Sequence, residues 1–123
     1  MTQPKGVVIL SAMRSGSNYL EEGIAQFPGF SGLGEVFNPS FVGQPDAPTL
    51  AGLTIEQRRV DPKSAIRRAE DGPKIPVIRW FPGHDAEALK QLALDPEWVR
   101  IFLTRRALDR FVSLKLAKAT GQW

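Results

Sequence analysis

Residues 7–20 read VVILSAMRSGSNYL, and this stretch decides the fold. Its first four residues are wholly apolar, which predicts a short strand buried on both faces, and such strands occur in parallel sheets. A helix is expected over residues 17–27, where apolar side chains recur at helical spacing before Pro28 and Gly29 end the pattern. These side chains are Leu20, Ile24 and Phe27. The stretch therefore predicts a strand, a loop and a helix in direct succession.

Strands and helices are expected to alternate along the rest of the chain. The expected strands are residues 76–80 and 99–104, and the expected helices are residues 61–70, 85–94 and 107–119, with Asp61 and Asp85 as N-caps. The last two helices carry apolar stripes, namely Ala86, Leu89, Leu92 and Ala93 in one, and Leu108, Val112, Leu116 and Ala119 in the other. Lys115 falls inside the second stripe. Residues 37–54 are rich in Pro, Gly and Ser and are expected to form a loop.

This alternation predicts an α/β fold in which residues 1–123 form one domain. A parallel sheet is expected in a three-layer arrangement, flanked by helices, with a ligand site at the carboxyl ends of its strands. Only three strands are expected, fewer than in a typical sheet, so one sheet edge should lack a partner strand.

Composition argues against several classes of protein. The chain has 123 residues and no apolar run that approaches the ~18 residues needed to span a membrane. It has no cysteine and a single histidine, which argues against disulfides, thiolate chemistry and an all-protein zinc site. We therefore expect a cytoplasmic protein with no transmembrane segment and no metal cofactor.

The charge pattern favours a small anionic ligand. The formal net charge is +3, and the basic residues are scattered along the chain rather than gathered in a run. A basic run or an aromatic-basic repeat is typical of nucleic-acid binders, and the sequence has neither. We therefore expect a phosphate-bearing small molecule rather than nucleic acid as the partner.

The loop at residues 11–18, SAMRSGSN, is the first candidate phosphate site. Between a buried strand and a helix start, its backbone N–H groups surround a space the size of one anion. Arg14 supplies a positive charge, Ser15 and Ser17 supply hydroxyls, and Gly16 and Asn18 complete the set of candidate binding residues. The alternatives are a plain turn capped by Ser17 and an ATP or GTP P-loop. The second alternative requires a first Gly and a final Gly-Lys-Ser/Thr, which this loop lacks.

This loop resembles the 5′-phosphosulfate loop of the sulfotransferase family, in the bacterial branch that acts on trehalose and glycolipids. The loop sequence of that branch is Pro-Arg-Ser-Gly-Ser/Thr, and Met13 occupies the proline position in this chain. The resemblance implies a P-loop-type sheet that is incomplete relative to full-length sulfotransferases. It also implies the donor 3′-phosphoadenosine 5′-phosphosulfate, with adenosine 3′,5′-bisphosphate as the product.

A second candidate phosphate site pairs Arg105 with Ser113, eight residues further on. The segment IFLTRRALDRFVSLKLAKATGQW, residues 101–123, is similar to the same branch, and the resemblance implies that Arg105 and Ser113 bind the 3′-phosphate. A guanidinium fork and a hydroxyl suit one phosphate. The alternative is helix capping by Ser113 and a surface charge at Arg105.

The candidate catalytic residues are Glu35 and Arg14. The segment GLGEVFNPS, residues 32–40, resembles the Gly-Glu-x-Phe-Asn-Pro segment of the branch, whose glutamate is taken as the base that deprotonates the acceptor. Screening by its apolar neighbours should raise the pKa of Glu35 towards working pH. An exposed loop acid is the alternative. His84 is the other obvious base, but it lies three residues after the position of the histidine that the cytosolic animal sulfotransferases use, so a helix-start histidine beside Asp85 is the preferred interpretation. Arg79 stands either for the strand-end lysine of the family or in a salt bridge.

The resemblance implies in-line transfer of a sulfuryl group to an acceptor hydroxyl, on a carbohydrate or a glycolipid, with Arg14 stabilising the charge on the leaving oxygen. A nucleotide-binding or interaction module without turnover is the alternative, and a basic nucleic-acid binder that uses the helix after Arg105 is a third class. Sulfotransferases of this kind continue beyond Trp123, so we expect this chain either to form a homo-oligomer or to be a fragment.

Overall fold

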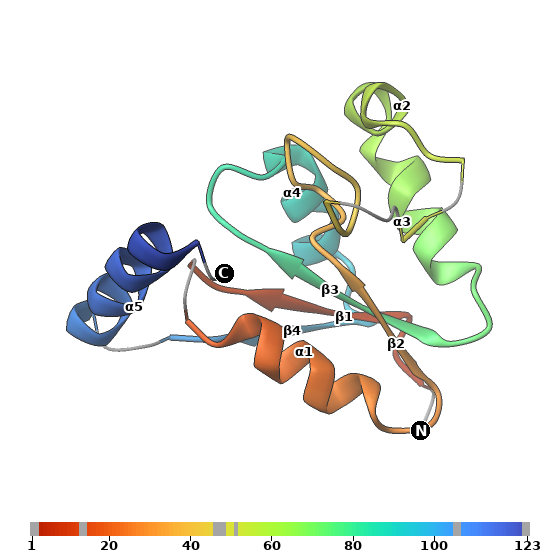
Figure 1. Ribbon diagram of the computed structural model, residues 1–123. Coiled ribbons are helices and arrows are strands. Elements are labelled where there is room, and N and C mark those ends of the chain that lie inside the picture. Colours follow the sequence, from red (N-terminus) through yellow and green to blue (C-terminus); the bar gives the residue numbers. More distant parts are fainter. Residues whose placement is uncertain (1–2, 13–14, 46–48, 51, 105–106, 122–123) are drawn as a thin grey trace.

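Four parallel strands form one sheet at the centre of the molecule (Figure 1). A computed structural model describes residues 3–12, 15–45, 49–50, 52–104 and 107–121, without the side chains of residues 107–111 and 113. The strands are β1 (Gly6–Leu10), β2 (Phe30–Gly34), β3 (Ile75–Trp80) and β4 (Trp98–Phe102), in the order β2-β3-β1-β4. The α/β fold with a parallel sheet predicted from the sequence is confirmed, and its fourth strand, β2, was not expected.

Helices join the strands and cover both faces of the sheet. They are α1 (Ser17–Ala25), α2 (Ile55–Val60), α3 (Pro62–Glu70), α4 (Ala86–Leu94) and α5 (Ala107–Thr120). Side chains alternate between faces along a strand, so neighbours on β1 enter different cores. Val8 packs with α3 and α4, whereas Val7 and Ile9 pack with Leu20 and Ile24 of α1.

The strand order places β1 between β3 and β4. Its residues pair with both neighbours, for example Val8 with Ile78 of β3 and with Arg100 of β4. After β1 the chain moves towards the β2 edge, and after β3 it moves to the β4 edge, so the direction of winding reverses beside β1. In open parallel sheets, ligands bind at the carboxyl ends of the strands next to such a reversal.

Local sequence signals explain most of the helix starts. Thr54 and Gln57 form a reciprocal capping box at α2, and Asp85 accepts hydrogen bonds from the N–H groups of Glu87 and Ala88 at α4. Pro62 opens α3, but the Asp61 carboxylate forms no capping bond and pairs with Arg67 instead. The predicted N-cap positions Asp85 and Asp61 are both confirmed, but at Asp61 the side chain makes no capping bond.

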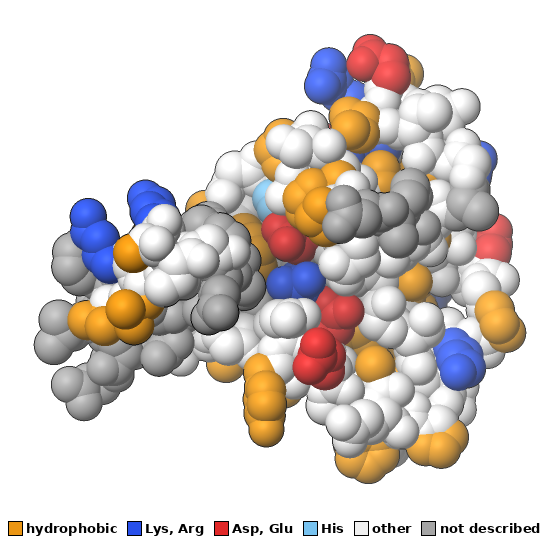
Figure 2. Space-filling model, in the orientation of Figure 1, with side chains coloured by type: hydrophobic (Ala, Val, Ile, Leu, Met, Phe, Trp, Pro, Cys, Tyr) orange, Lys and Arg blue, Asp and Glu red, His pale blue; other side chains and the backbone are white. Residues whose placement is uncertain are grey.

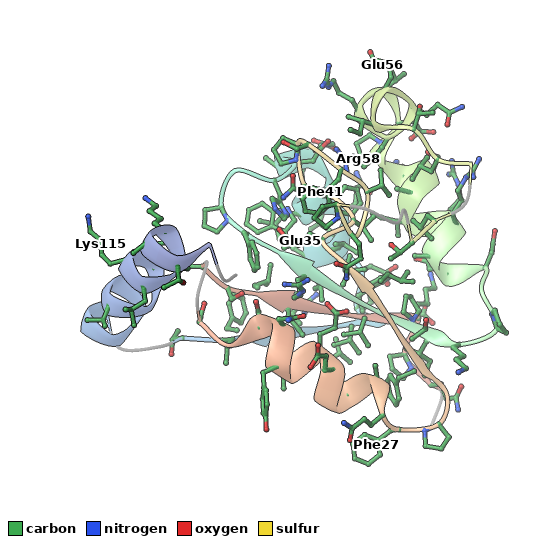
Figure 3. All side chains as sticks on the ribbon, viewed as in Figure 1. Phe27, Glu35, Phe41, Glu56, Arg58 and Lys115 are labelled. Carbon is green, nitrogen blue, oxygen red and sulfur yellow. The ribbon has the colours of Figure 1, made fainter. Side chains whose placement is uncertain are left out.

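The apolar stripes of α1 and α4 differ from the expectation. The helix α1 ends at Ala25, so Phe27 lies beyond it with 65% of its surface exposed (Figure 3). In α4 the buried residues are Ala88 and Leu92, and Ala86 is exposed.

The last helix, α5, projects beyond the end of the sheet (Figure 1). Val112 and Leu116 are exposed, as are Lys115 and Ala119, whereas Ala117 is buried. The predicted core-facing stripe of this helix is therefore wrong at its described positions. No helix in the described part of the chain is long and apolar enough to cross a membrane.

Candidate functional site

The loop after β1 leads directly into the N-terminus of α1. Gly16 is the N-cap and has a left-handed backbone, with φ 88°, a conformation that glycine adopts without strain. No side chain of the described residues caps this helix, so within this part of the chain its first N–H groups are not covered by a capping group. The alternative of a plain turn with Ser17 as the N-cap does not hold, because Ser17 is the first helical residue and is buried.

The other candidate phosphate-binding residues of this loop differ in exposure. Ser15 is buried, and its hydroxyl donates a hydrogen bond to the carbonyl oxygen of Ala12, so this hydroxyl supports the loop from inside. Gly16 and Asn18 are exposed. Arg14 lies outside the described residues.

The second predicted phosphate site is only partly described. Ser113 lies on α5, but its side chain is outside the description, and so is the whole of Arg105. The strand-then-helix context expected for the pair is present, since β4 ends at Phe102 and α5 begins at Ala107. The pairing of Arg105 with Ser113 therefore stays a prediction.

Glu35 follows β2 directly and is fixed through its backbone. Its N–H donates to the carbonyl oxygen of Gly43 at 2.9 Å, and the N–H of Gly43 donates back to the Glu35 carbonyl at 3.0 Å. This antiparallel bridge closes the loop between the two residues. The side chain of Glu35 is 18% exposed, which excludes the freely exposed loop acid considered above.

Three groups surround the Glu35 carboxylate. Asn38 Nδ2 donates to Oε1 at 3.1 Å, His84 Nε2 lies 3.5 Å from the same oxygen, and Arg79 Nη1 lies 3.8 Å from Oε2. Burial raises the pKa of Glu35, but the bonds from His84 and Asn38 and the charge of Arg79 outweigh it, so the pKa lies below its ordinary value. The expectation of a raised pKa is therefore wrong, since the apolar neighbours contribute less than these partners.

His84 is held inside the protein, next to Glu35. Its Nδ1 accepts a hydrogen bond from the N–H of Phe81 at 3.3 Å, which directs Nε2 to the carboxylate. Its ring meets Trp80 edge-on, with 6.1 Å between centroids, and lies 5.3 Å from the ring of Phe81. Only 4% of the side chain is exposed. The two candidate bases thus form one contact pair, and Glu35 is the member that solvent reaches.

Arg79 connects this pair to α1. Its Nε lies 2.6 Å from Oε1 of Glu21, in an ion pair between buried side chains. Burial raises the pKa of Glu21 above its ordinary value although Arg79 and the N–H of Gly34 favour the charged form. Of the two expectations for Arg79, the salt bridge is present. We call the resulting row, Glu21, Arg79, Glu35 and His84, the charged chain.

Arg58 was not singled out from the sequence, and it organises the loop after Glu35. From α2 its guanidinium donates to three backbone carbonyl oxygens, those of Val36 at 2.5 Å, Asn38 at 2.7 Å and Phe41 at 2.9 Å. Figure 3 shows Arg58 and Phe41 close together, with Glu35 below them. Its position in the basic pair Arg58-Arg59 gave no signal, because Arg59 is exposed and its ion pair within the described part of the chain is with Glu56.

The charged chain lies mostly below the surface and reaches it at Glu35, which is 18% exposed. Figure 2 shows the single histidine of the chain next to acidic and basic side chains on this face. Glu21 lies four residues after Ser17, which is about 6 Å along a helix axis. The arrangement therefore places an ionised, partly exposed carboxylate near the helix N-terminus that follows the central strand. Comparisons with protein-family models, with curated proteins and with solved structures found no match.

Proposed function

We propose that this chain binds 3′-phosphoadenosine 5′-phosphosulfate at the loop of residues 11–18 and transfers its sulfuryl group to a hydroxyl held at Glu35. The observation that carries the proposal is the position of Glu35. Its carboxylate is fixed by three neighbours, stays partly exposed, and is tied through Arg79 and Glu21 to the helix that begins with the phosphate loop.

The fold supports the donor site. The loop lies between the central strand β1 and α1, where the strand order β2-β3-β1-β4 reverses. The uncapped first turn of α1 attracts an anion through its N–H groups and the helix dipole. A P-loop-type, three-layer architecture is part of this proposal, as are the phosphate contacts of Arg14, Arg105 and Ser113.

Partial exposure decides which group takes the proton. An acceptor reaches the Glu35 carboxylate, whereas the His84 ring is enclosed by Trp80 and Phe81. We therefore assign the base role to Glu35, and His84 and Asn38 are positioning residues. The acceptor is a hydroxyl compound, for which the sequence resemblance suggests a carbohydrate or a glycolipid.

The transfer is an in-line displacement at sulfur. The acceptor oxygen forms a bond to sulfur as its proton passes to Glu35, and the bond from sulfur to the bridging oxygen breaks. Negative charge then grows on the leaving adenosine 3′,5′-bisphosphate. The N–H groups at the start of α1 and the charge of Arg14 stabilise it, as in phosphoryl transfer, where positioning and electrostatics supply most of the catalysis.

A transfer assay with a labelled sulfuryl donor tests the proposal. Glu35→Gln should lower the rate by about 100-fold, the common scale for a lost general base. Glu22→Gln, at an exposed position on α1, is the matched control and should keep full activity. Full activity of Glu35→Gln would refute the assigned role.

A nucleotide-binding module without turnover is the second candidate function. The lowered pKa of Glu35 favours it, because a carboxylate with a lower pKa is a weaker base. Binding of adenosine 3′,5′-bisphosphate together with no measurable sulfuryl transfer would select this candidate.

A further inference from the structure

A pocket opens between α4 and the carboxyl ends of the strands, on the side of the sheet away from α1. Its volume is about 370 Å³, within the range of small-molecule sites. The sheet contributes Leu10, Trp80 and Phe102, the helix contributes Leu89 and Ala93, and Ser11, Pro82 and Arg100 complete the lining. Apolar side chains therefore form most of the wall.

The hydroxyl of Ser11 in this wall has no hydrogen-bond partner among the described residues. Ser11 is only 9% exposed, and its Oγ is enclosed. Buried hydroxyls normally have a partner, because leaving one unpaired costs about 1 to 3 kcal/mol. Ser11 is a lining residue of the pocket, so a rotation of its side chain would bring this unpaired hydroxyl to a group bound there.

The only charged side chain in the described lining is already engaged. Arg100 Nη1 donates to the carbonyl oxygen of Ala93 at 2.9 Å and lies 3.4 to 3.5 Å from those of Asp95 and Leu92. It therefore satisfies the C-terminal carbonyls of α4. Apart from this guanidinium, the lining residues are apolar or uncharged, so the described wall of the pocket favours an uncharged ligand.

The α4 stripe predicted from the sequence supports the same conclusion. Leu89 and Ala93 were expected to face the core, and they line this pocket instead. Leu92, from the same stripe, is fully buried. The helix thus presents apolar side chains to an opening.

We propose that this pocket binds a planar, uncharged aromatic group that carries one hydrogen-bonding atom, which pairs with Ser11 Oγ. Trp80 provides an aromatic wall and also meets His84, so the pocket adjoins the charged chain without sharing its charged groups. The inference goes beyond the proposed function and does not require a nucleotide or turnover.

Nuclear magnetic resonance titration with 2-naphthol tests this inference on the nucleotide-free chain. The indole N–H of Trp80, which donates to the carbonyl oxygen of Asp85, should shift on binding. That of Trp98, which donates to Glu70, is the internal reference and should not shift. An absence of binding, or equal shifts of both indoles, would overturn the proposal.

Matched ligands and variants isolate the hydrogen bond. Ser11→Ala should weaken 2-naphthol binding by about three- to tenfold, the scale of one hydrogen bond, and leave 2-methylnaphthalene binding unchanged. The variant should fold at least as stably as the parent, because it removes an unpaired buried hydroxyl. Ala93→Leu, at an exposed position of α4, should weaken both ligands by narrowing the pocket. Equal effects of Ser11→Ala on both ligands, no effect of Ala93→Leu, or tighter binding of 2-naphthoate than of 2-naphthol would contradict the proposal.

Discussion

Arg79 Nε lies 2.6 Å from Glu21 Oε1, and this ion pair joins β3 to α1 across the face of the sheet. Both side chains are almost fully buried, with 9% and 7% exposed. The pair holds the helix that follows the proposed phosphate loop, and the same guanidinium faces Glu35. The spacing between the loop and the proposed base therefore depends on Arg79.

Replacing one partner of this ion pair should lower the free energy of unfolding more than replacing both partners. Arg79→Met leaves the Glu21 carboxylate buried without its counter-ion, which should lower the free energy of unfolding by about 3 kcal/mol or more. The double variant Arg79→Met, Glu21→Met should regain most of this loss, and urea denaturation measures both. The exposed pair of Arg67 and Asp61 is the control, and Arg67→Ala should cost less than about 1 kcal/mol. A double variant less stable than Arg79→Met would contradict the account.

Arg58 should matter to both stability and activity, whereas its neighbour Arg59 should matter to neither. Arg58→Ala leaves three backbone carbonyls of the Glu35 loop without their donor, which should cost about 2 to 4 kcal/mol. Arg59→Ala removes only an exposed contact with Glu56. Thermal or urea unfolding compares the two variants, and an equal effect of both would show that Arg58 does not organise the loop.

Glu35 should stabilise the fold at neutral pH and lose this effect in acid. Its folded-state pKa is lower than the ordinary value of 4.5, so its stabilisation is complete above about pH 4.5 and is lost as the pH falls through the folded-state pKa. Glu35→Gln should therefore remove part of the acid sensitivity seen in urea midpoints between pH 7 and pH 3. The raised pKa of Glu21 has the opposite effect on the pH dependence of stability. Glu21 is present in both proteins, so it does not explain a difference between their profiles. Parallel pH profiles of the two proteins would contradict the environment described for Glu35.

Substitution by alanine should change the stability of the fold in opposite directions at two glycines that both have free space around them. Gly16 has a positive φ, so Gly16→Ala should destabilise the fold by about 1 kcal/mol. Gly23 lies inside α1, where Gly23→Ala should stabilise by about 0.5 to 1 kcal/mol. A Cβ added at either position would meet no atom within 4 Å, so steric clashes do not complicate the comparison. Stabilisation by both substitutions would show that the loop does not need the left-handed conformation.

Much of the fold could be predicted because its signals are local. The buried strand β1 follows from its apolar run, and the start of α4 follows from the Asp85 cap. The strand β2 gave no such signal, because two of its five residues are glycine and it contains no apolar run. One of them, Gly32, leaves room for the Glu21 carboxylate, which a Cβ would approach to 2.6 Å.

The site was harder to predict because its contacts join distant residues. Glu35 was identified from its local segment, but the pKa of its carboxylate depends on His84 and Arg79, more than forty residues away in the sequence. The contacts of Glu21 and Arg58 with β3 and with the loop appear only once the sheet is assembled. The apolar stripe of α5 was expected to face a core but is exposed at Val112 and Leu116, because apolar spacing does not reveal whether a core lies opposite a helix.

Isothermal titration calorimetry with adenosine 3′,5′-bisphosphate and with ATP tests the central claim most directly. The account predicts that the bisphosphate binds more tightly than ATP, because the two proposed phosphate sites would each take one of its phosphates and the loop lacks the lysine of an ATP-binding P-loop. Equal or tighter binding of ATP would contradict the assignment of the donor.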